Sequence, residues 1–335
     1  MDCQSEIVVS PIEAKCVSCG KKYLSHNGIP QFSDDQYWGK IKESELLSII
    51  NIIEKEGFSA FTKDMQKKLD FTYDEDRADW RYFIPLNSSA VALDIGSGLG
   101  RITIPLARVC KTVVSCDLSL SRMKFLSARA KAENLHNVQV FVGDVYNLPL
   151  QEKSFDLIVM NGVLEWVGLT KKFSDPREAQ IESLRICKKL LKPGGHLYIG
   201  IENRIALVYL KAKDHGGLRY TSYMPRKIAN WYSKIRGNKH GYRTYTYSKK
   251  GYEKLIHEAG FANPAQFYLL YPGYNLPRII IPYEHIPGFQ YLIRTFKRSA
   301  SVLKNSLYWI ASSGFGIRLY RLVFFSFGIV IKNDQ

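Results

Sequence analysis

The residues best suited to chemistry gather in a glycine-rich turn that follows a short apolar strand. The strand reads VALDI, and Gly96, Gly98 and Gly100 follow it at alternate positions. Glycine adopts backbone angles that other residues avoid, and it lets a ligand lie against the main chain. A dinucleotide-binding turn is spaced Gly-x-Gly-x-x-Gly, but Arg101 occupies the position of its third glycine here. Asp94 places a carboxylate at the end of the strand, which suits a cationic ligand better than a diphosphate.

Polar residues also stand at the ends of the next predicted strands. The segment 112–117 reads as a strand that ends in Asp117, 17 residues beyond Gly100. In nucleotide-binding βαβ units, an acid at this place accepts hydrogen bonds from the hydroxyls of a ribose. The two strands that follow lead into Asp144 and Asn161. Ligands of parallel sheets bind outside the carboxyl ends of the strands, so these side chains form a candidate binding site.

The segments between and around these strands have helical periodicity. Residues 119–133, with Ser119 as the N-cap, and residues 177–191 read as helices. A further strand is predicted at 196–201, and one or two amphipathic helices at 41–70. Strands that alternate with helices at this interval predict a parallel sheet with helices on both faces.

Residues 89–202 resemble a class I S-adenosylmethionine-dependent methyltransferase. The segments that carry the resemblance occur in the order typical of the family, namely VALDIGSGLGRITIPLA, the acid of VVSCDLS, VGDVYNLPL, FDLIVMNGVLEW and LKPGGHLYI. They are specific for the fold and the cofactor and carry little information on the acceptor. The resemblance implies a Rossmann-like α/β fold with a seven-stranded, mostly parallel sheet, helices on both faces and an antiparallel last strand. Insertions are expected after the fifth strand and before the last one.

The resemblance also implies which residues surround the methionine part of the cofactor. Gly96, Gly98 and Gly100 would border it, and Asp94 would lie beside its ammonium group. Asn161 would lie near the methionyl group.

The nucleoside part of the cofactor has its own set of implied residues. Asp117 would hold the ribose hydroxyls, and Leu118 would lie against the adenine. Asp144 would accept a hydrogen bond from the adenine amino group, while Val145 would donate its backbone N–H.

Transfer of a methyl group from a sulfonium is an in-line displacement, and the acceptor must be held opposite the sulfur at about 3 Å. An alcohol acceptor also needs a base to take its proton. The insertion after the fifth strand is about 45 residues long, and loops of this length are typical of lids and substrate pockets. The candidate bases lie on predicted loops or strand ends and are Glu165, Glu202, His215 and His240.

Positive charge is concentrated in the last part of the chain. Residues 203–335 hold 21 Lys and Arg against 5 Asp and Glu, together with 15 of the 21 Tyr, so residues 1–202 are balanced in formal charge. A basic, tyrosine-rich region suits a nucleic acid, an anionic sugar or a membrane headgroup. A generally basic host proteome would produce the same excess.

The segment 279–321 combines apolar and basic residues at helical spacing. Its apolar residues are Phe289, Leu292, Ile293, Phe296, Leu303, Leu307, Trp309 and Ile310. Such a composition is typical of an interfacial helix on anionic lipid, and equally of a helix that docks on the core and leaves its basic face in solvent. Peripheral contact with the inner membrane surface therefore stays open beside a soluble acceptor.

Taken together, these features predict an S-adenosylmethionine-dependent methyltransferase that acts on an oxygen or nitrogen of a saccharide or other small molecule. One alternative is methylation of RNA through the basic region, although the sequence after the fourth strand, NGVL, lacks an Asn-Pro-Pro-Tyr-type motif. Another is a protein that binds the cofactor without catalysis, which would require the insertion to block the acceptor site.

The N-terminal segment contains a possible metal site. Cys16 and Cys19 are spaced as in a zinc knuckle and are followed by glycine. The segment resembles the small zinc-ribbon peptide that precedes many bacterial methyltransferase domains, but in place of a second Cys-x-x-Cys pair it offers Cys3 alone. His26 or water could complete a tetrahedral site. The alternative is a metal-free knuckle packed by aromatic and aliphatic side chains.

The chain as a whole has the composition of a cytoplasmic globular enzyme. It has 335 residues, 46% of them hydrophobic, and its first ten residues do not resemble a signal peptide. Six cysteines are too few for a disulfide scaffold of this size. We expect a zinc-ribbon-like peptide, a helical cap, a cofactor-binding core and a final region with the substrate insertion, the last strands and a basic extension, at residues 1–35, 36–88, 89–202 and 203–335.

If Cys3, Cys16 and Cys19 hold zinc, the purified protein should carry about one equivalent of the metal, because three thiolates already supply most of a tetrahedral site. Cys16→Ser should release it. Elemental analysis by mass spectrometry of the two proteins measures this directly. A metal-free wild-type protein with the same thermal stability as Cys16→Ser would show that the knuckle holds no metal.

Overall fold

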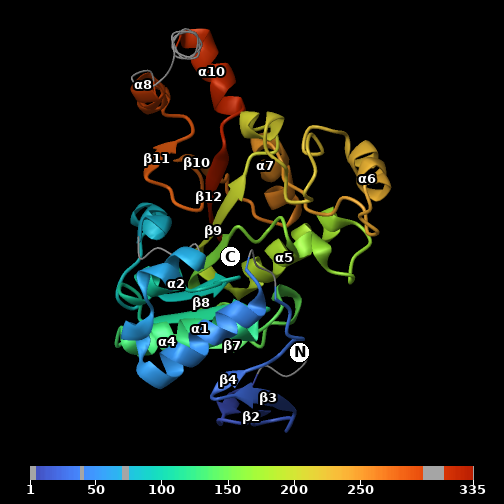
Figure 1. Cartoon of the computed structure of the whole chain (residues 1–335). Coiled ribbons are helices and arrows are strands. Elements are labelled where there is room, and N and C mark those ends of the chain that lie inside the picture. Colours follow the sequence, from blue (N-terminus) through green and yellow to red (C-terminus); the bar gives the residue numbers. More distant parts are fainter. Residues whose placement is uncertain (1–4, 38–40, 70–74, 297–312, 335) are drawn as a thin grey trace. The chain divides into compact units, whose positions relative to one another are not determined.

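The computed structural model describes residues 5–37, 41–69, 75–296 and 313–334 (Figure 1). The chain forms two compact units. The first unit contains the chain up to Met160 together with Ile186–Leu197, and the second contains Asn161–Arg185 and Tyr198–Asp334.

The first unit begins with a small antiparallel sheet. Its strands pair in the order β1-β2-β3-β4, with bounds Ile7–Val9, Glu13–Cys16, Lys22–His26 and Ile29–Pro30. Cys16 is the last residue of β2 and Cys19 lies in the turn that follows, where Gly20 donates its N–H to the carbonyl of Cys16 at 3.1 Å. Cys3 lies outside the described residues, and Nε2 of His26 lies 2.8 Å from Oε1 of Gln31. The zinc site therefore stays a prediction.

The predicted helices of segment 41–70 are confirmed as α1 (Glu43–Glu56) and α2 (Lys63–Lys68), with the short 3₁₀ turn η1 (Phe58–Ala60) between them. The buried face of α1 carries Leu46, Ile49, Ile50 and Ile53, and these side chains share one cluster with Phe125. The four aliphatic side chains on one face of this amphipathic helix thus pack against another helix of the same unit.

The larger sheet of the first unit is parallel, as predicted. Strands β5 (Val91–Ile95), β6 (Thr112–Asp117) and β7 (Val138–Val142) pair in sequence order, and β8 (Phe155–Asn161) pairs with β5 on its other side. The helices α3 (Thr103–Ala107) and α4 (Leu120–Ala132) connect the strands.

The next helix and strand differ slightly from the prediction. Helix α5 spans Pro176–Leu190, close to the expected 177–191, but β9 (Leu191–Glu202) begins five residues before the predicted strand. The Lys-Pro-Gly-Gly stretch belongs to the first part of β9. Strand β9 runs from the first unit into the second.

The second unit continues the sheet with β10 (Gln266–Tyr271), β11 (Ile279–Pro282) and β12 (Ser326–Lys332). Strand β10 is antiparallel to both β11 and β12. Among the described residues, eight strands are ordered β11-β10-β12-β9-β8-β5-β6-β7. The Rossmann-like α/β fold and the antiparallel last strand are thus confirmed. The sheet has one strand more than the predicted seven, because β11 lies within the insertion that was expected before the last strand.

The remaining helices of the second unit are α6 (Arg226–Ile235), α7 (Lys249–Glu258), α8 (Ile286–Phe296) and α10 (Gly314–Leu322), with the short 3₁₀ turn η5 (Leu207–Leu210). In α8 the residues Phe289, Leu292 and Ile293 are buried, so these side chains belong to the core and not to a lipid-facing surface. Leu303, Leu307, Trp309 and Ile310 lie outside the described residues. Within the described ranges, no helix is both long and apolar enough to cross a membrane.

Gly100 is the glycine of the turn at which a side chain would disturb packing most. Its φ is 78°, and an added Cβ would collide with Cδ1 of the buried Leu126. Gly100→Ala should lower the free energy of unfolding by about 1–3 kcal/mol for overpacking and about 1–2 kcal/mol more for the left-handed backbone. Thermal denaturation followed by circular dichroism measures the loss.

Gly98→Ala is the matched control for this prediction. Gly98 lies in the same turn with a φ of 55°, but no described atom outside its chain neighbours lies within 4 Å of the position that a Cβ would take there. Gly98→Ala should therefore show the backbone cost alone. Equal losses in the two variants would contradict the packing role of Gly100.

Candidate functional site

The glycine turn of the first unit has the backbone conformation that its sequence predicts. Gly96, Gly98 and Gly100 have φ values of 69°, 55° and 78°, all in the left-handed region. The N–H groups of Gly96 and Ser97 both donate to the carbonyl of Cys116, at 2.8 and 3.1 Å. The turn is thereby fixed to the end of β6, and it leaves open space at Gly98.

Asp117, at the end of β6, joins this turn to the next helix. Its Oδ2 accepts from the N–H of Gly98 and its Oδ1 from the N–H of Ser119, both at 3.0 Å. Nη1 of Arg122 lies 3.5 Å from Oδ2. A carboxylate has about four acceptor positions, so Asp117 can still accept hydrogen bonds from a ligand.

Asp94 is buried, with 2% of its surface exposed. Its Oδ2 accepts from the hydroxyl of Thr103 at 2.7 Å, and that hydroxyl lies 2.9 Å from the hydroxyl of Ser115. Burial raises the pKa of Asp94 to about 7, although the hydrogen bond from Thr103 acts to lower it. A cation near this carboxylate would offset the cost of burying its charge, as expected beside an ammonium group.

The residues expected around the adenine lie at the ends of β6 and β7. Leu118 is half-buried and Val145 is buried. Asp144 caps the 3₁₀ turn η3 (Val145–Asn147), because its Oδ1 accepts from the N–H of Tyr146 at 3.1 Å.

The segment that follows the small sheet adds contacts that the sequence analysis missed. Gln36 donates its N–H to the carbonyl of Leu118, and Oδ1 of Asp35 accepts from the N–H of Leu120, both at 2.9 Å. Phe32 donates its N–H to the carbonyl at the end of β7 at 2.8 Å. No motif marks this segment, since its contacts are mostly made by backbone atoms.

Asn161 ends β8 and belongs to the second unit. It is 5% exposed, and neither polar atom of its amide has a hydrogen-bond partner among the described residues. A side chain at Gly200 would collide with this amide. A buried amide without partners is costly, so the site has polar capacity that a ligand could use, as expected near the methionyl group.

Three of the four candidate bases meet in the second unit. Glu165 follows the end of β8 by four residues, Glu202 is the last residue of β9, and His215 lies in the insertion. Nε2 of His215 lies 2.8 Å from Oε1 of Glu202 and 3.8 Å from Oε1 of Glu165. The side chain of Glu165 is fully buried, while those of Glu202 and His215 are 18% and 20% exposed. His240 is exposed and outside this cluster.

Burial and mutual contact set the charges of this Glu165–Glu202–His215 cluster. Burial, and then the charge of Glu202, raise the pKa of Glu165 to about 8. Burial acts to lower the pKa of His215, but its contact with Glu202 and the charges of the nearby acids outweigh burial and raise it to about 9. At neutral pH, Glu165 therefore carries a proton and His215 is an imidazolium. One ligand atom from each side chain lies within 4.8 Å of the others, so the same group could also face a metal ion.

The loop that carries His215 is fixed by its own hydrogen bonds. Oδ1 of Asp214 accepts from the N–H of Gly216 at 2.9 Å, and Oδ2 accepts from the hydroxyl of Thr221. The ring of Trp166 packs edge-on against the ring of His215, and the two ring centres are 4.9 Å apart. Asp214 and Trp166 are positioning residues that the sequence analysis did not assign.

Arg204 holds the far end of the same loop. Its Nε and Nη2 donate to the carbonyls of Ser222 and Met224 at 2.5 and 2.6 Å. Burial lowers the pKa of Arg204. The Glu-Asn-Arg run at the end of β9 was the available signal for this role, because a charged residue directly after a buried strand needs a partner.

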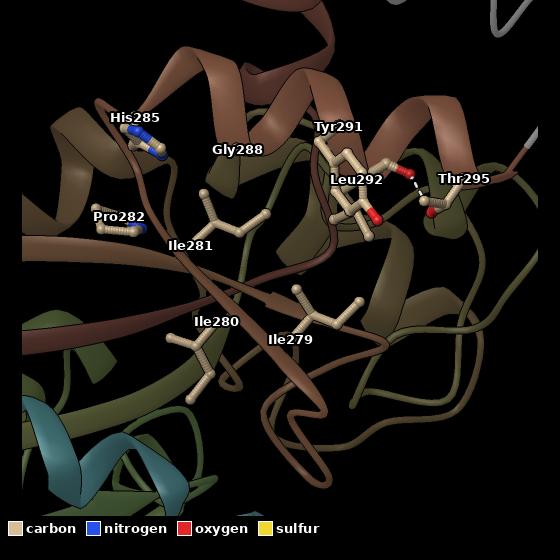
Figure 2. Close-up of a pocket in the computed structure, with 9 residues that line it drawn as sticks. All are labelled: Ile279, Ile280, Ile281, Pro282, His285, Gly288, Tyr291, Leu292 and Thr295. Carbon is tan, nitrogen blue, oxygen red and sulfur yellow. Dashed lines mark hydrogen bonds between the residues drawn. The ribbon is translucent and has the colours of Figure 1, made fainter.

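A separate apolar cavity of about 310 Å³ lies between β11 and α8. Figure 2 shows Ile279 and Ile281 of the strand facing Tyr291 and Leu292 of the helix. His285 is the one imidazole among the side chains that line it. None of the candidate site residues lines this cavity. Its apolar lining suits the binding of an apolar group, and we do not expect proton transfer there.

Comparison with known proteins supports the assignment of the core. Residues 93–199 match the family described as Methyltransferase domain. The chain is 26% identical over 114 residues to a malonyl-[acyl-carrier protein] O-methyltransferase of Marinomonas sp., which is 34% of this chain and 38% of that protein. It is 30% identical over 142 residues to a ubiquinone biosynthesis O-methyltransferase of Parvibaculum lavamentivorans, which is 42% of this chain and 50% of that protein. The chain thus spans half or less of the length of these relatives.

Among solved structures, the chain is similar to a Haemonchus contortus phosphoethanolamine N-methyltransferase 2 in complex with phosphomonomethylethanolamine and S-adenosylhomocysteine. The TM-score is 0.47 at 14% identity, over 86% of this chain and 60% of that one. The family match covers the end of β5, the glycine turn that follows it, and the strands β6 to β8. Residues 93–199 of this chain therefore match a methyltransferase domain.

Proposed function

We propose that this chain transfers a methyl group from S-adenosylmethionine to an oxygen or nitrogen of a saccharide or other small molecule. The domain match over residues 93–199 supports the reaction class. The observation that carries the acceptor chemistry is the Glu165–Glu202–His215 cluster, because an ion pair beside a buried acid can exchange a proton.

The residues of the first unit fit the cofactor that the domain implies. When bound, S-adenosylmethionine supplies a methyl group on a cationic sulfur. Asp117 would accept hydrogen bonds from the ribose hydroxyls, with its carboxylate already fixed by Gly98 and Ser119. Asp94 would face the ammonium group. Of the second unit, Asn161 would lie near the methionyl group, because its amide has no hydrogen-bond partner among the described residues. Leu118, Asp144 and Val145 would contact the adenine.

In the acceptor chemistry we assign His215 as the base. Glu202 holds Nε2 of the imidazole, which leaves Nδ1 as the nitrogen that takes a proton from the acceptor. Since the pKa of His215 is raised to about 9, the neutral, basic form becomes abundant only at alkaline pH. The protonated carboxyl of Glu165 can donate a hydrogen bond within the cluster or to the acceptor.

The charge of the chain narrows the acceptor class. Residues 203–335 carry 21 basic against 5 acidic residues, which favours an anionic acceptor such as an acidic saccharide or a lipid-linked one. We propose in addition that the chain contacts an anionic membrane surface. Methyl transfer would then take place at the membrane surface.

The test is transfer of labelled methyl from S-adenosylmethionine to fractions of a host extract. Label in the saccharide or small-molecule fraction, with a mass increase of one CH₂ unit, is the expected result. Label in RNA would instead favour a nucleic-acid methyltransferase. Cofactor binding without transfer to any fraction would favour a cofactor-binding protein without catalysis.

Asp117→Asn should weaken S-adenosylmethionine binding by about 10- to 100-fold, because charge-assisted hydrogen bonds contribute about 1.5–3 kcal/mol each and water replaces part of this. Isothermal titration calorimetry measures the affinity. The control is Asp156→Asn, which removes a similarly hydrogen-bonded acid at the amino end of β8, where it accepts from Val91 and Lys192. Wild-type affinity in Asp117→Asn would show that the cofactor assignment is wrong.

The rate of methyl transfer should rise between pH 7 and pH 9, because His215 must lose a proton whose pKa is about 9. His215→Gln should lower the rate by about 10²- to 10⁴-fold and flatten the profile. Glu202→Gln should move the rise to lower pH, since the carboxylate that stabilises the imidazolium is gone. Single-turnover rates at a series of pH values measure this.

His240→Gln is the control for the pH profile, because His240 is exposed and lies outside the cluster. Its rate and profile should match those of the wild type. A rise with pH that persists unchanged in His215→Gln would refute the role of His215 as base.

A further inference from the structure

Helix α6 of the second unit exposes its large apolar side chains and buries its small ones. Ile228, Trp231 and Ile235 are 51%, 63% and 62% exposed, whereas Ala229 and Ser233 are buried. The three large side chains are spaced by three and four residues, so they share one face of the helix. A surface helix normally turns such residues toward the core. The exposure of this face therefore indicates that it binds a partner outside the unit.

Contacts on its buried side fix α6 in this orientation. Oδ1 of Asn230 accepts from the N–H of Tyr242 at 3.2 Å, and Nδ2 of Asn238 donates to the hydroxyl of Ser233 at 2.8 Å. The guanidinium of Arg226 lies 4.1 Å from the centre of the Tyr245 ring and donates to the carbonyl of Thr246. Turning the apolar face inward would break all of these contacts.

The surroundings of this face are strongly basic. Residues 215–252 contain nine Lys and Arg and no Asp or Glu. Four of these basic residues are exposed on α6 or directly after it, namely Lys227, Lys234, Arg236 and Lys239. The face formed by Ile228, Trp231 and Ile235 therefore has a rim of positive charge and lacks acidic groups in its own segment.

We propose that α6 docks this protein on an anionic membrane surface, with Ile228, Trp231 and Ile235 among the lipid headgroups and the basic rim on their phosphates. An apolar face that includes Trp and is flanked by Lys and Arg is the composition of an interfacial helix. A nucleic-acid surface stacks successive bases on aromatic side chains, and of the three large side chains of this face two are isoleucines and Trp231 alone is aromatic. The inference rests on the membrane contact proposed above and does not depend on the transfer chemistry.

The experiment is co-sedimentation of the full chain with vesicles of neutral phosphatidylcholine alone, or mixed with anionic phosphatidylglycerol, at low and high salt. The wild type should bind the anionic vesicles, and high salt should weaken binding. Trp231→Ser combined with Ile228→Ser should weaken it by about tenfold or more. Lys227→Glu with Lys234→Glu should do the same by reversing two charges of the rim.

The matched control is Leu207→Ser with Leu210→Ser. These residues of η5 are 43% and 52% exposed, so the variant removes exposed apolar groups from another element of the second unit. It should bind like the wild type. Loss in this variant with full binding of the α6 variants would overturn the assignment to α6, whereas absence of binding by the wild type would overturn the membrane contact itself.

Tryptophan fluorescence gives a second readout. A blue shift on adding anionic vesicles should disappear in Trp231→Phe while binding persists, because phenylalanine keeps an apolar group at the surface. Cofactor affinity, measured alongside, should be unchanged in every variant, which separates failure of docking from failure of the proposed function. Competition by an oligonucleotide for the same face, without vesicle binding, would contradict the proposal.

Discussion

The arrangement of the first unit depends on the hydrogen bonds that the carboxylate of Asp117 accepts. One oxygen holds the N–H of Gly98 in the glycine turn, and the other holds the N–H of Ser119, the N-cap of α4. Helix α4 then supplies Leu126, against which Gly100 lies without a side chain, and Phe125, on which α1 packs. A single acid at a strand end thus joins a backbone turn, a helix start and a hydrophobic cluster.

The buried acids Asp94 and Glu165 lie in environments that stabilise them in different ways. Burial raises the pKa of Asp94 to about 7 although the hydroxyl of Thr103 donates a hydrogen bond to it, and a cationic ligand would favour its charged form. Glu165 lies beside an ion pair and keeps its own proton at neutral pH, with a pKa of about 8. The first arrangement suits binding of a cation, and the second suits movement of a proton. Environment, and not residue type, separates their roles.

Much of the cofactor core could be predicted from the sequence because its signals are local. The strands of residues 91–95 and 112–117 are short apolar runs that lead into glycine or an acid, and both have the predicted bounds. Gly96, Gly98 and Gly100 adopt the positive φ that their spacing demanded. Parallel pairing then follows from the helices between the strands.

The parts that could not be predicted depend on contacts between distant segments. Strand β11 is only four residues long, and its place is set by pairing with β10 and not by its own periodicity. Glu165, Glu202 and His215 could each be named as a candidate base, but their meeting depends on how a long insertion folds back. The orientation of α6 was equally hidden, since a helical repeat of apolar residues predicts burial and only tertiary contacts reverse it.

The insertion after β9 connects the Glu165–Glu202–His215 cluster to the exposed face of α6. Asp214 and Arg204 fix the loop that carries His215, and the carbonyl of Met224, which accepts from Arg204, lies two residues before α6 begins. Arg226, the first residue of α6, donates to the carbonyl of Thr246 and stacks on Tyr245, so the helix is anchored at the end nearer to that loop. A helix held in this way cannot reorient without moving the loop. The exposed apolar face of α6 and His215 therefore belong to one insertion. The hydrogen bonds of Asp214 and Arg204 hold the loop of His215, and that of Arg226 holds the start of the helix.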